Sequence, residues 1–451
     1  MAGSVQVSLP ISWSLHHQHK QRQPLSATTC ALSKQGHRFF SSLAAAAGDD
    51  SSAQRLIRKF VASSSKPIAL NALSHLLSSD NIHPNLSSLA LPLYTRITTT
   101  SWFYWNPKLV ACLIALLDQQ GQFEDAETLL SESVQKLGFR DGDQDLAIFY
   151  CDLIDSCSKR GSKQGVLWSY GHLKQLLFDS PNFSLRRRAS EMMIRGLCTL
   201  DLPHEAEKLM EEMTALEGFK PSPFEFKCII NGYGRTGSFT EMRRVLGLME
   251  DEGYVLDTIC SNIVLSSYGA HSELSELVSW LRKMKDSDIQ FSFRTYNTVL
   301  NSCPTIMSIL RDPKLLPLTM EGLIEKLPKE EGFLVEELIG SPVLMETLKW
   351  SCSEGKLDLH GMHLGSALVI MLQWMEELRS GFHSGSLVVP VTVIIVCGAG
   401  RHSGVRGESP VKALIKEMMI RLRSPLRIDR KNVGCFVAKG KAVKEWLCLQ
   451  H

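Results

Sequence analysis

The clearest pattern of apolar and polar positions lies between residues 224 and 297, where the sequence matches itself at an offset of 35 residues. Each copy carries two apolar stripes at helical spacing, which predicts two short amphipathic helices. A glycine between the stripes marks the turn that joins the two helices. The stripes are Phe226, Ile229, Ile230 and Tyr233, then Phe239, Met242, Leu246 and Met249 in the first copy, and Val264, Leu265 and Tyr268, then Leu274, Leu277, Leu281 and Met284 in the second.

One such helical hairpin cannot bury its apolar stripes alone, so we expect the copies to stack into an all-α solenoid. Weaker copies of the pattern extend toward the N-terminus, and the repeats are predicted to span residues 107–302. Three proline residues from position 304 onward end the pattern. The earlier helix pairs are predicted at 109–117 with 123–134, 148–158 with 164–177, and 190–198 with 204–213. The first helix of one further repeat is predicted at 295–300.

The N-terminal part of the chain does not follow the repeat pattern. Residues 1–48 contain no Asp or Glu and are rich in Ser, Gln, His and Ala. That composition is typical of an organellar transit peptide, with an ordinary disordered tail as the alternative, so we exclude residues 1–50 from the predicted fold. Residues 51–106 are expected to form a segment with helices at 53–64 and 68–77 that caps the first repeat, because terminal repeats of a solenoid need covering.

Charge and cysteine content limit the classes of function. There are 49 Lys and Arg residues against 47 Asp and Glu residues, so a nucleic-acid site would have to be a local basic surface. The 12 cysteine residues form no closely spaced pairs, and we interpret them as reduced core residues, neither disulfides nor metal ligands. No apolar run is long enough to span a bilayer.

The C-terminal part changes from helical to mixed periodicity. Residues 303–355 are interpreted as a connector with helices at 320–327 and 343–352. A second domain is predicted over residues 356–451, with strands around 357–361, 391–396, 426–429 and 433–438 and helices at 364–378, 410–422 and 441–448. Ser409 before Pro410 is a typical start of a helix. This order of elements predicts a small α/β sandwich, so the whole chain is a multi-domain protein.

The repeated segments resemble a known family. The sequences at 147–155, 228–233 and 294–300, the Gly-Phe-Lys-Pro link at 218–221 and the 35-residue period look like pentatricopeptide repeats. Tetratricopeptide repeats have a 34-residue period and a Trp, Leu-Gly and Tyr signature that is missing here. The resemblance implies binding of single-stranded RNA, with one base read by two or three side chains of each repeat.

The same resemblance places the base-reading side chains near the start of each first helix and at the end of the repeat. Of the implied pairs, only Asn262 with Ser292 resembles a combination that the family uses. The alternative is that these are solvated residues at helix starts in a solenoid that binds a protein partner. The implied RNA-binding residues are Glu191 with Ser222, Lys227 with Asp257, Asn262 with Ser292, and Asn297 in a unit without a clear end.

Two motifs in the second domain resemble the Small MutS-related (Smr) domain. One is the strand Leu357-Asp358-Leu359-His360-Gly361, and the other is a glycine-rich loop after a buried strand, where backbone N–H groups can approach an anion. Cys397 stands where that loop usually begins with Thr. The resemblance implies nucleic-acid binding and, in some members, endonuclease activity. Its candidate catalytic residues are Asp358, His360 and His402, and its candidate phosphate-binding loop contains Gly398, Gly400 and Arg401.

Asp358 and His360 lie two residues apart on a strand, so their side chains share one face. If the domain cuts RNA, His360 can act as a base and Asp358 can orient it or hold a metal ion. The alternative is that both residues make structural hydrogen bonds to the neighbouring loop. We expect no cofactor, except for a divalent metal such as Mg²⁺ if the domain is a nuclease.

Repeats followed by such a domain are typical of plant organellar proteins. The resemblance thus predicts a chloroplast protein, with the mitochondrion as the alternative, that binds organellar RNA and acts in RNA processing, stabilisation or expression. Protein partners in an RNA-processing complex are compatible with this hypothesis. The competing hypotheses are a guided endoribonuclease and a helical-repeat scaffold that binds protein partners without RNA selectivity.

Overall fold

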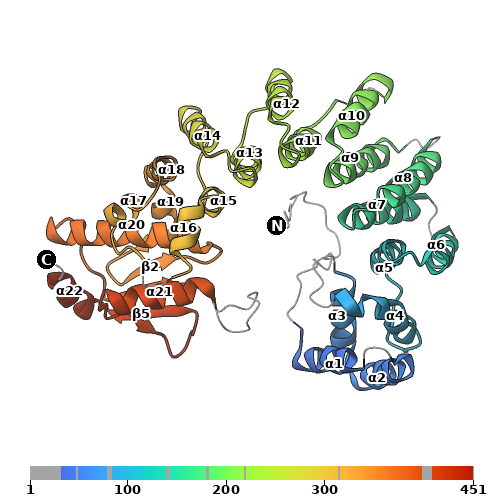
Figure 1. Ribbon diagram of the computed structural model, residues 1–451, viewed down its shortest axis with the longest axis horizontal. Coiled ribbons are helices and arrows are strands. Elements are labelled where there is room, and N and C mark those ends of the chain that lie inside the picture. The colour runs from blue at the N-terminus through green and yellow to red at the C-terminus, as the bar shows by residue number, and fades with distance from the viewer. Residues whose placement is uncertain are drawn as a thin grey trace.

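The computed structural model describes residues 32–46, 49–78, 84–138, 143–178, 182–217, 220–312, 315–398 and 409–449. The chain forms an arch of helices, with an N-terminal helical bundle at one end and a domain that contains a sheet at the other (Figure 1). Residues 1–31 of the predicted transit peptide, and Gly400, Arg401 and His402 of the predicted site, lie outside the described residues.

The N-terminal bundle contains α1 (Lys34–Ala45), α2 (Asp50–Ser63), α3 (Lys66–Leu76), the 3₁₀ helix η1 (Pro84–Leu89) and α4 (Ala90–Thr98). Helices α2 and α3 confirm the two helices predicted for this segment. The exclusion of residues 1–50 from the fold is wrong for α1, because its apolar side is buried. The Phe39 ring stacks on the Phe60 ring of α2 at 3.8 Å between centroids, and Phe40 and Leu43 are buried as well.

The repeats follow as helix pairs in the predicted order. Side chains that accept a backbone N–H begin several of the first helices, as Ser222 does for α11, so local sequence fixes where these helices start. The pairs are α5 (Pro107–Gln119) with α6 (Phe123–Gly138), α7 (Asp143–Lys159) with α8 (Lys163–Leu177), α9 (Phe183–Thr199) with α10 (Pro203–Glu217), α11 (Pro223–Arg235) with α12 (Phe239–Asp251), and α13 (Thr258–Ala270) with α14 (Leu274–Asp286), and α15 (Phe293–Asn301) follows.

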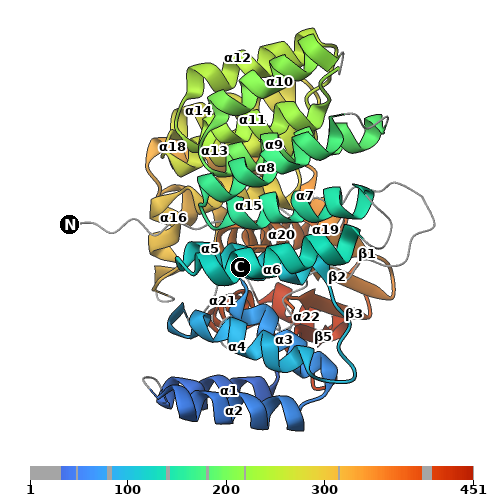
Figure 2. The same ribbon diagram turned by 90° about the vertical axis from the view of Figure 1, so that its right-hand side faces the viewer.

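The first helices of the pairs, α5, α7, α9, α11, α13 and α15, lie on the inner side of the arch, and the second helices lie on the outer side (Figure 1). Each first helix packs directly against the first helix of the next pair. We call this set of helices the inner row. The view turned by 90° shows the successive pairs stacked on one another, as a solenoid requires (Figure 2).

The connector is built from α16 (Pro304–Ile309), α17 (Met320–Ile324), α18 (Lys329–Ile339) and α19 (Val343–Thr347). Helix α18 packs against α14 and α15, where Glu337 binds Arg282 and Lys285 at 2.8 and 2.7 Å. The helix predicted to run from 343 to 352 is wrong beyond residue 347. There the chain turns back as a strand that pairs with the residues after the turn.

The C-terminal domain contains β1 (Leu348–Trp350), β2 (Glu354–Asp358), α20 (Leu364–His383), β3 (Thr392–Val396), α21 (Pro410–Arg421), β4 (Arg427–Ile428), β5 (Cys435–Lys439) and α22 (Gly440–Cys448). The sheet has the order β1-β2-β3-β5-β4, and only β2 and β3 run parallel. The predicted α/β architecture is thereby confirmed. Its predicted start at residue 356 is too late, because β1 belongs to the same sheet.

The two faces of this sheet differ. Leu357, Ile395 and Phe436 are aligned across β2, β3 and β5 and are buried. Helices α20 and α21 contact each other. The other face, which we call the open face, is only partly covered, and it carries Lys356 and Asp358 on β2 together with the exposed residues Arg427 on β4 and Lys439 on β5.

Candidate nucleic-acid interface

The predicted base-reading residues of three repeats occupy equivalent places on the inner row. The residue that closes one repeat is also the N-cap residue of the next first helix, and the other reader lies five residues further along that helix. Because these helices pack side by side in chain order, the readers form a regular series. The N-cap residues are Ser222, Asp257 and Ser292, and the residues five positions on are Lys227, Asn262 and Asn297.

Asn262 and Ser292 differ in how far their polar groups are already hydrogen-bonded. The Oδ1 atom of Asn262 is buried and has no hydrogen-bond partner among the described residues. Ser292 caps α15, where its hydroxyl accepts a hydrogen bond from the backbone N–H of Thr295 at 3.3 Å. A buried amide oxygen without a partner carries a free-energy cost that a donor from a ligand would relieve. The Asn262 oxygen therefore lacks a partner among the described residues, whereas the Ser292 hydroxyl is used in the cap of α15.

Lys227 and Asp257 bind each other. The Lys227 Nζ atom lies 2.7 Å from Asp257 Oδ2, and Asp257 Oδ1 accepts the backbone N–H of Cys260 at 2.8 Å. The Lys227 side chain is only 11% exposed. A base at this repeat would have to compete with an existing ion pair.

Glu191 and Ser222 are linked through two other residues. Glu191 accepts a hydrogen bond from Arg187 at 3.0 Å, and Arg187 also lies 3.6 Å from Glu225. Glu225 is buried and completes the capping box with Ser222 at the start of α11. Burial raises the pKa of Glu191, although the hydrogen bond from Arg187 opposes that shift. The pair therefore lies in a local network of carboxylates and one arginine.

Asn297 has a different role from the one that its position in the repeat predicts. Its Nδ2 atom donates to the Gly361 carbonyl at 3.0 Å, and its Oδ1 atom accepts the His363 backbone N–H at 2.8 Å. The side chain is buried at 8% exposure. Both polar atoms of the amide are thus occupied by the C-terminal domain. The structure thus gives the Asn297 amide two backbone partners at the place where its position in the repeat predicts contact with a base.

The residues of the predicted second site meet at the ends of β2 and β3. Asp358 pairs with Val396 across the two strands, and its Oδ1 atom accepts the backbone N–H of His360 at 3.0 Å. Gly398 has φ +78°, a conformation that favours glycine, and a Cβ placed on it would lie 3.5 Å from His360 Cδ2. The fold therefore brings Asp358, His360 and Gly398 together.

Cys397 is buried beside this turn. Its backbone N–H donates to the Gly434 carbonyl at 2.8 Å, and its carbonyl accepts a hydrogen bond from Ser409 at 3.2 Å. Burial raises the pKa of the Cys397 thiol to about 12, so at neutral pH the thiol is protonated. Cys397 acts here as a small core residue.

Two further residues contact this turn, and the sequence motifs do not identify them. Asn301 Nδ2 lies 2.6 Å from His363 Nδ1, and Phe293 is the side chain nearest to Gly361. Phe293, Asn297 and Asn301 follow one another at four-residue intervals on α15, so they share one face of that helix. This four-residue spacing is visible in the sequence, but the sequence alone does not show which part of the chain contacts that face of the helix.

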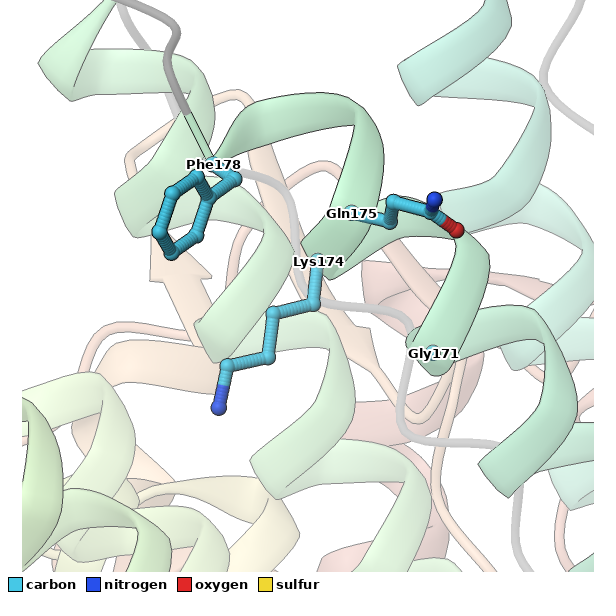
Figure 3. A pocket seen from close by; sticks show the side chains of 4 residues that line it. All are labelled: Gly171, Lys174, Gln175 and Phe178. Carbon is cyan, nitrogen blue, oxygen red and sulfur yellow. The ribbon is translucent and has the colours of Figure 1, made fainter.

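A surface hollow lies away from both predicted sites. It has a volume of about 570 Å³ and is lined by Gly171, Lys174, Gln175 and Phe178, all on or directly after the outer helix α8 (Figure 3). One helix alone supplies this lining, and none of the predicted site residues belongs to it. In the described part of the chain, no group of three or more His, Cys, Asp or Glu side chains could hold a metal ion. No helix in that same part is long and apolar enough to cross a membrane.

Stacked helical hairpins with an inner row of equivalent polar residues define the chain as a helical-repeat solenoid protein. The PPR repeat family matches residues 192–216, 226–254 and 259–289. Pentatricopeptide repeat-containing protein At2g17033 of Arabidopsis thaliana is 50% identical over 445 residues, which cover 98% of this chain and 87% of that protein. The chain therefore belongs to the pentatricopeptide repeat family.

More distant similarities are shorter or weaker. Pentatricopeptide repeat-containing protein ATP4, chloroplastic, of Zea mays is 23% identical over 54% of this chain and 36% of its own length. The crystal structure of the maize pentatricopeptide repeat protein PPR10 matches with 14% identity and a TM-score of 0.34, over 85% of this chain and 59% of that chain. PPR10 in complex with an 18-nt psaJ RNA element matches with a TM-score of 0.27, over 67% of this chain and 54% of that chain. The chain thus spans little more than half of these solved chains.

Proposed function

We propose that this protein is an organellar RNA-binding protein whose inner row holds single-stranded RNA and whose C-terminal domain is a nucleic-acid-binding domain of the Smr type. Its role would be in the processing, stabilisation or expression of the bound transcript. The observation that carries the proposal is the regular series of N-cap and fifth-position residues along the inner row. In that series, Asn262 offers an amide oxygen that lacks a partner among the described residues.

The charge distribution supports a nucleic-acid role for the C-terminal domain. Residues 356–451 contain fourteen Lys and Arg residues against seven Asp and Glu residues, whereas the whole chain has a formal net charge of +2. Of the described residues, Lys356, Arg427 and Lys439 lie on the open face of the sheet together with the acidic residues Glu354 and Asp358. An excess of basic residues of this kind attracts the phosphate backbone without reading its sequence.

The selective part of the proposal can be tested by selecting RNA from a random single-stranded pool with the purified full chain. We expect one enriched motif, and we expect Asn262→Ala to relax selection at a single nucleotide. Gln175→Ala is the matched control, because it removes an amide from the outer helix α8 and should leave the motif unchanged. If no motif is enriched and affinity does not fall with salt, the protein is instead a scaffold for protein partners.

Cleavage is a separate question within the proposal. Asp358 and His360 are the described residues that could position a water molecule or move a proton at a phosphodiester. They supply one carboxylate and one imidazole, and one carboxylate oxygen is already used by the His360 N–H. Two side chains are too few ligands for a metal site, so we propose no step through a metal ion. Asp358→Asn should abolish any cleavage of the selected RNA while its affinity stays unchanged.

The organelle can be tested with fluorescent fusions. We propose the chloroplast, with the mitochondrion as the other outcome. A fusion of residues 1–31 leaves out α1, and a fusion of residues 1–60 includes it. If import needs only the segment before the folded bundle, both fusions should enter the same organelle. Fluorescence that stays in the cytosol with both fusions would contradict the proposed location.

A further inference from the structure

We propose that Asn297 reads no base and instead fixes the turn at residues 359–363, which contains His360. This turn, the turn of His360, lies at the next step of the inner row. The C-terminal domain would then meet the bound strand about one nucleotide beyond the base read by Asn262 and Ser292. This inference rests on the proposed function, because it needs a strand that lies along the inner row.

Both polar atoms of the Asn297 side chain bind the turn. Its amide donates to the carbonyl of Gly361 at 3.0 Å and accepts from the N–H of His363 at 2.8 Å. Both partners are backbone atoms, so the contact fixes the path of the chain independently of the side chains at 361 and 363. Asn262, at the equivalent place one repeat earlier, has no such partner for its Oδ1 atom. The same residue type therefore serves two purposes in adjacent repeats.

Neighbouring residues on α15 support the same turn. Gly361 has φ +84°, and a Cβ placed on it would lie 3.4 Å from a ring atom of Phe293. Asn301 Nδ2 lies 2.6 Å from His363 Nδ1. Because these contacts come from one face of one helix, the turn is held over its length and not at a single point.

The held turn leads directly to His360. The backbone N–H of Leu359 donates to the Val396 carbonyl at 2.8 Å, and the backbone N–H of His360 donates to Asp358 at 3.0 Å. Within the turn, the backbone N–H of Met362 also donates to the Leu359 carbonyl at 3.2 Å. The position of His360 relative to the repeats is therefore set by α15.

Helix α20 takes the next place in the inner row. It packs against α15 as α15 packs against α13. Gly365 permits this close approach, because a Cβ on it would lie 3.0 Å from Leu300 Cβ. Packed helices lie about 8–10 Å apart, so one step along the row is the same distance on both sides of α15. If one repeat accommodates one base, the strand that leaves Asn262 reaches the turn of His360 at about the next nucleotide.

The test uses the full chain and the RNA motif that it selects. The nucleotide opposite Asn262 is identified first, as the position whose base preference changes in Asn262→Ala. A photo-crosslinking amino acid, p-benzoylphenylalanine, then replaces His360, and the crosslinked nucleotide is mapped by primer extension. We expect crosslinks to concentrate on one nucleotide next to the one opposite Asn262.

Asn297→Ala is then combined with the crosslinking residue. We expect the selected motif to stay the same and the single crosslink to be lost or spread over several nucleotides. Asn297→Asp is the second variant, since it keeps the acceptor for the His363 N–H and removes the donor to Gly361. Circular dichroism shows whether either variant is folded, and Gln175→Ala is again the control that should change neither result.

Two results would overturn the inference. One is a change of base preference at a single position in Asn297→Ala, which would make Asn297 a reader. The other is a crosslink that stays on the same nucleotide in both folded Asn297 variants. Failure of the unaltered chain to select any motif would instead refute the proposed function, so the two failures are distinguishable.

Discussion

Replacing the buried Glu207 by alanine should loosen the joint between two adjacent repeats. Glu207 lies on α10 and is 4% exposed. It accepts a hydrogen bond from the Tyr233 hydroxyl of α11 at 2.7 Å, and both its oxygens lie 2.8 Å from the Arg244 Nη2 atom of α12. One carboxylate thus joins three helices. Burial and the hydrogen bond to Glu207 raise the pKa of Tyr233, so the hydroxyl remains a donor at neutral pH.

The expected magnitude follows from the exposure of the two partners. Tyr233 is 5% exposed, so the loss of its acceptor leaves a buried hydroxyl unsatisfied, which costs about 1–3 kcal/mol. The Arg244 side chain is 44% exposed and can return to water, so the loss of that ion pair costs at most about 1 kcal/mol. We expect Glu207→Ala to lower the free energy of unfolding by about 2–3 kcal/mol, and Tyr233→Phe by about 1 kcal/mol.

Urea unfolding followed by circular dichroism measures these changes. A repeat array need not unfold in one step, so hydrogen exchange of α10, α11 and α12 should be measured in parallel. Glu212→Ala on the exposed side of α10 is the control and should change stability by less than about 0.5 kcal/mol. The reasoning is refuted if Glu207→Ala behaves like this control, or if Tyr233→Phe costs the same with and without Glu207.

Three other changes test the C-terminal domain and its junction with the repeats. Gly365→Val should force α20 away from Leu300 on α15 and lower the free energy of unfolding by about 1–3 kcal/mol in the same urea assay. Gly355→Ala should separate β1 from β2, because the new Cβ would lie 2.6 Å from the Trp350 ring, and limited proteolysis near residue 350 should detect this. Burial lowers the pKa of His363 from its ordinary 6.5, so the unfolded chain takes up this proton at a higher pH than the folded chain. The melting temperature should therefore fall as pH drops below about 6.5, and His363→Gln should remove that part of the pH dependence.

The repeat period explains which parts of the fold could be predicted. Each turn between paired helices contains one residue in the left-handed conformation, and these residues are spaced by 40, 40, 36 and 35 residues along the chain. The 35-residue offset was therefore clear only in the later repeats, whereas the first two units carry extra residues. Helical periodicity still located their helices, because burial of the stripes does not depend on the length of the loops. The left-handed residues are Gly121, Gly161, Asp201, Gly237 and Ser272.

The candidate site was predictable only where local rules apply. The caps by Ser222, Asp257 and Ser292 follow from their own segments. The role of Asn297 does not, because its partners Gly361 and His363 are 64 and 66 residues away in sequence. An asparagine at the right place in the repeat looks the same in sequence whether or not another domain occupies its amide.

The covering of both ends of the arch has a consequence for self-association. A bare helical repeat would present its apolar stripe to any identical molecule and could grow into a filament by end-to-end stacking. Here α2 turns the charged residues Arg55, Arg58 and Lys59 to solvent at one end, and α20 covers α15 at the other. Within the described residues, both ends of the array are therefore covered, which disfavours growth by end-to-end stacking of the repeats.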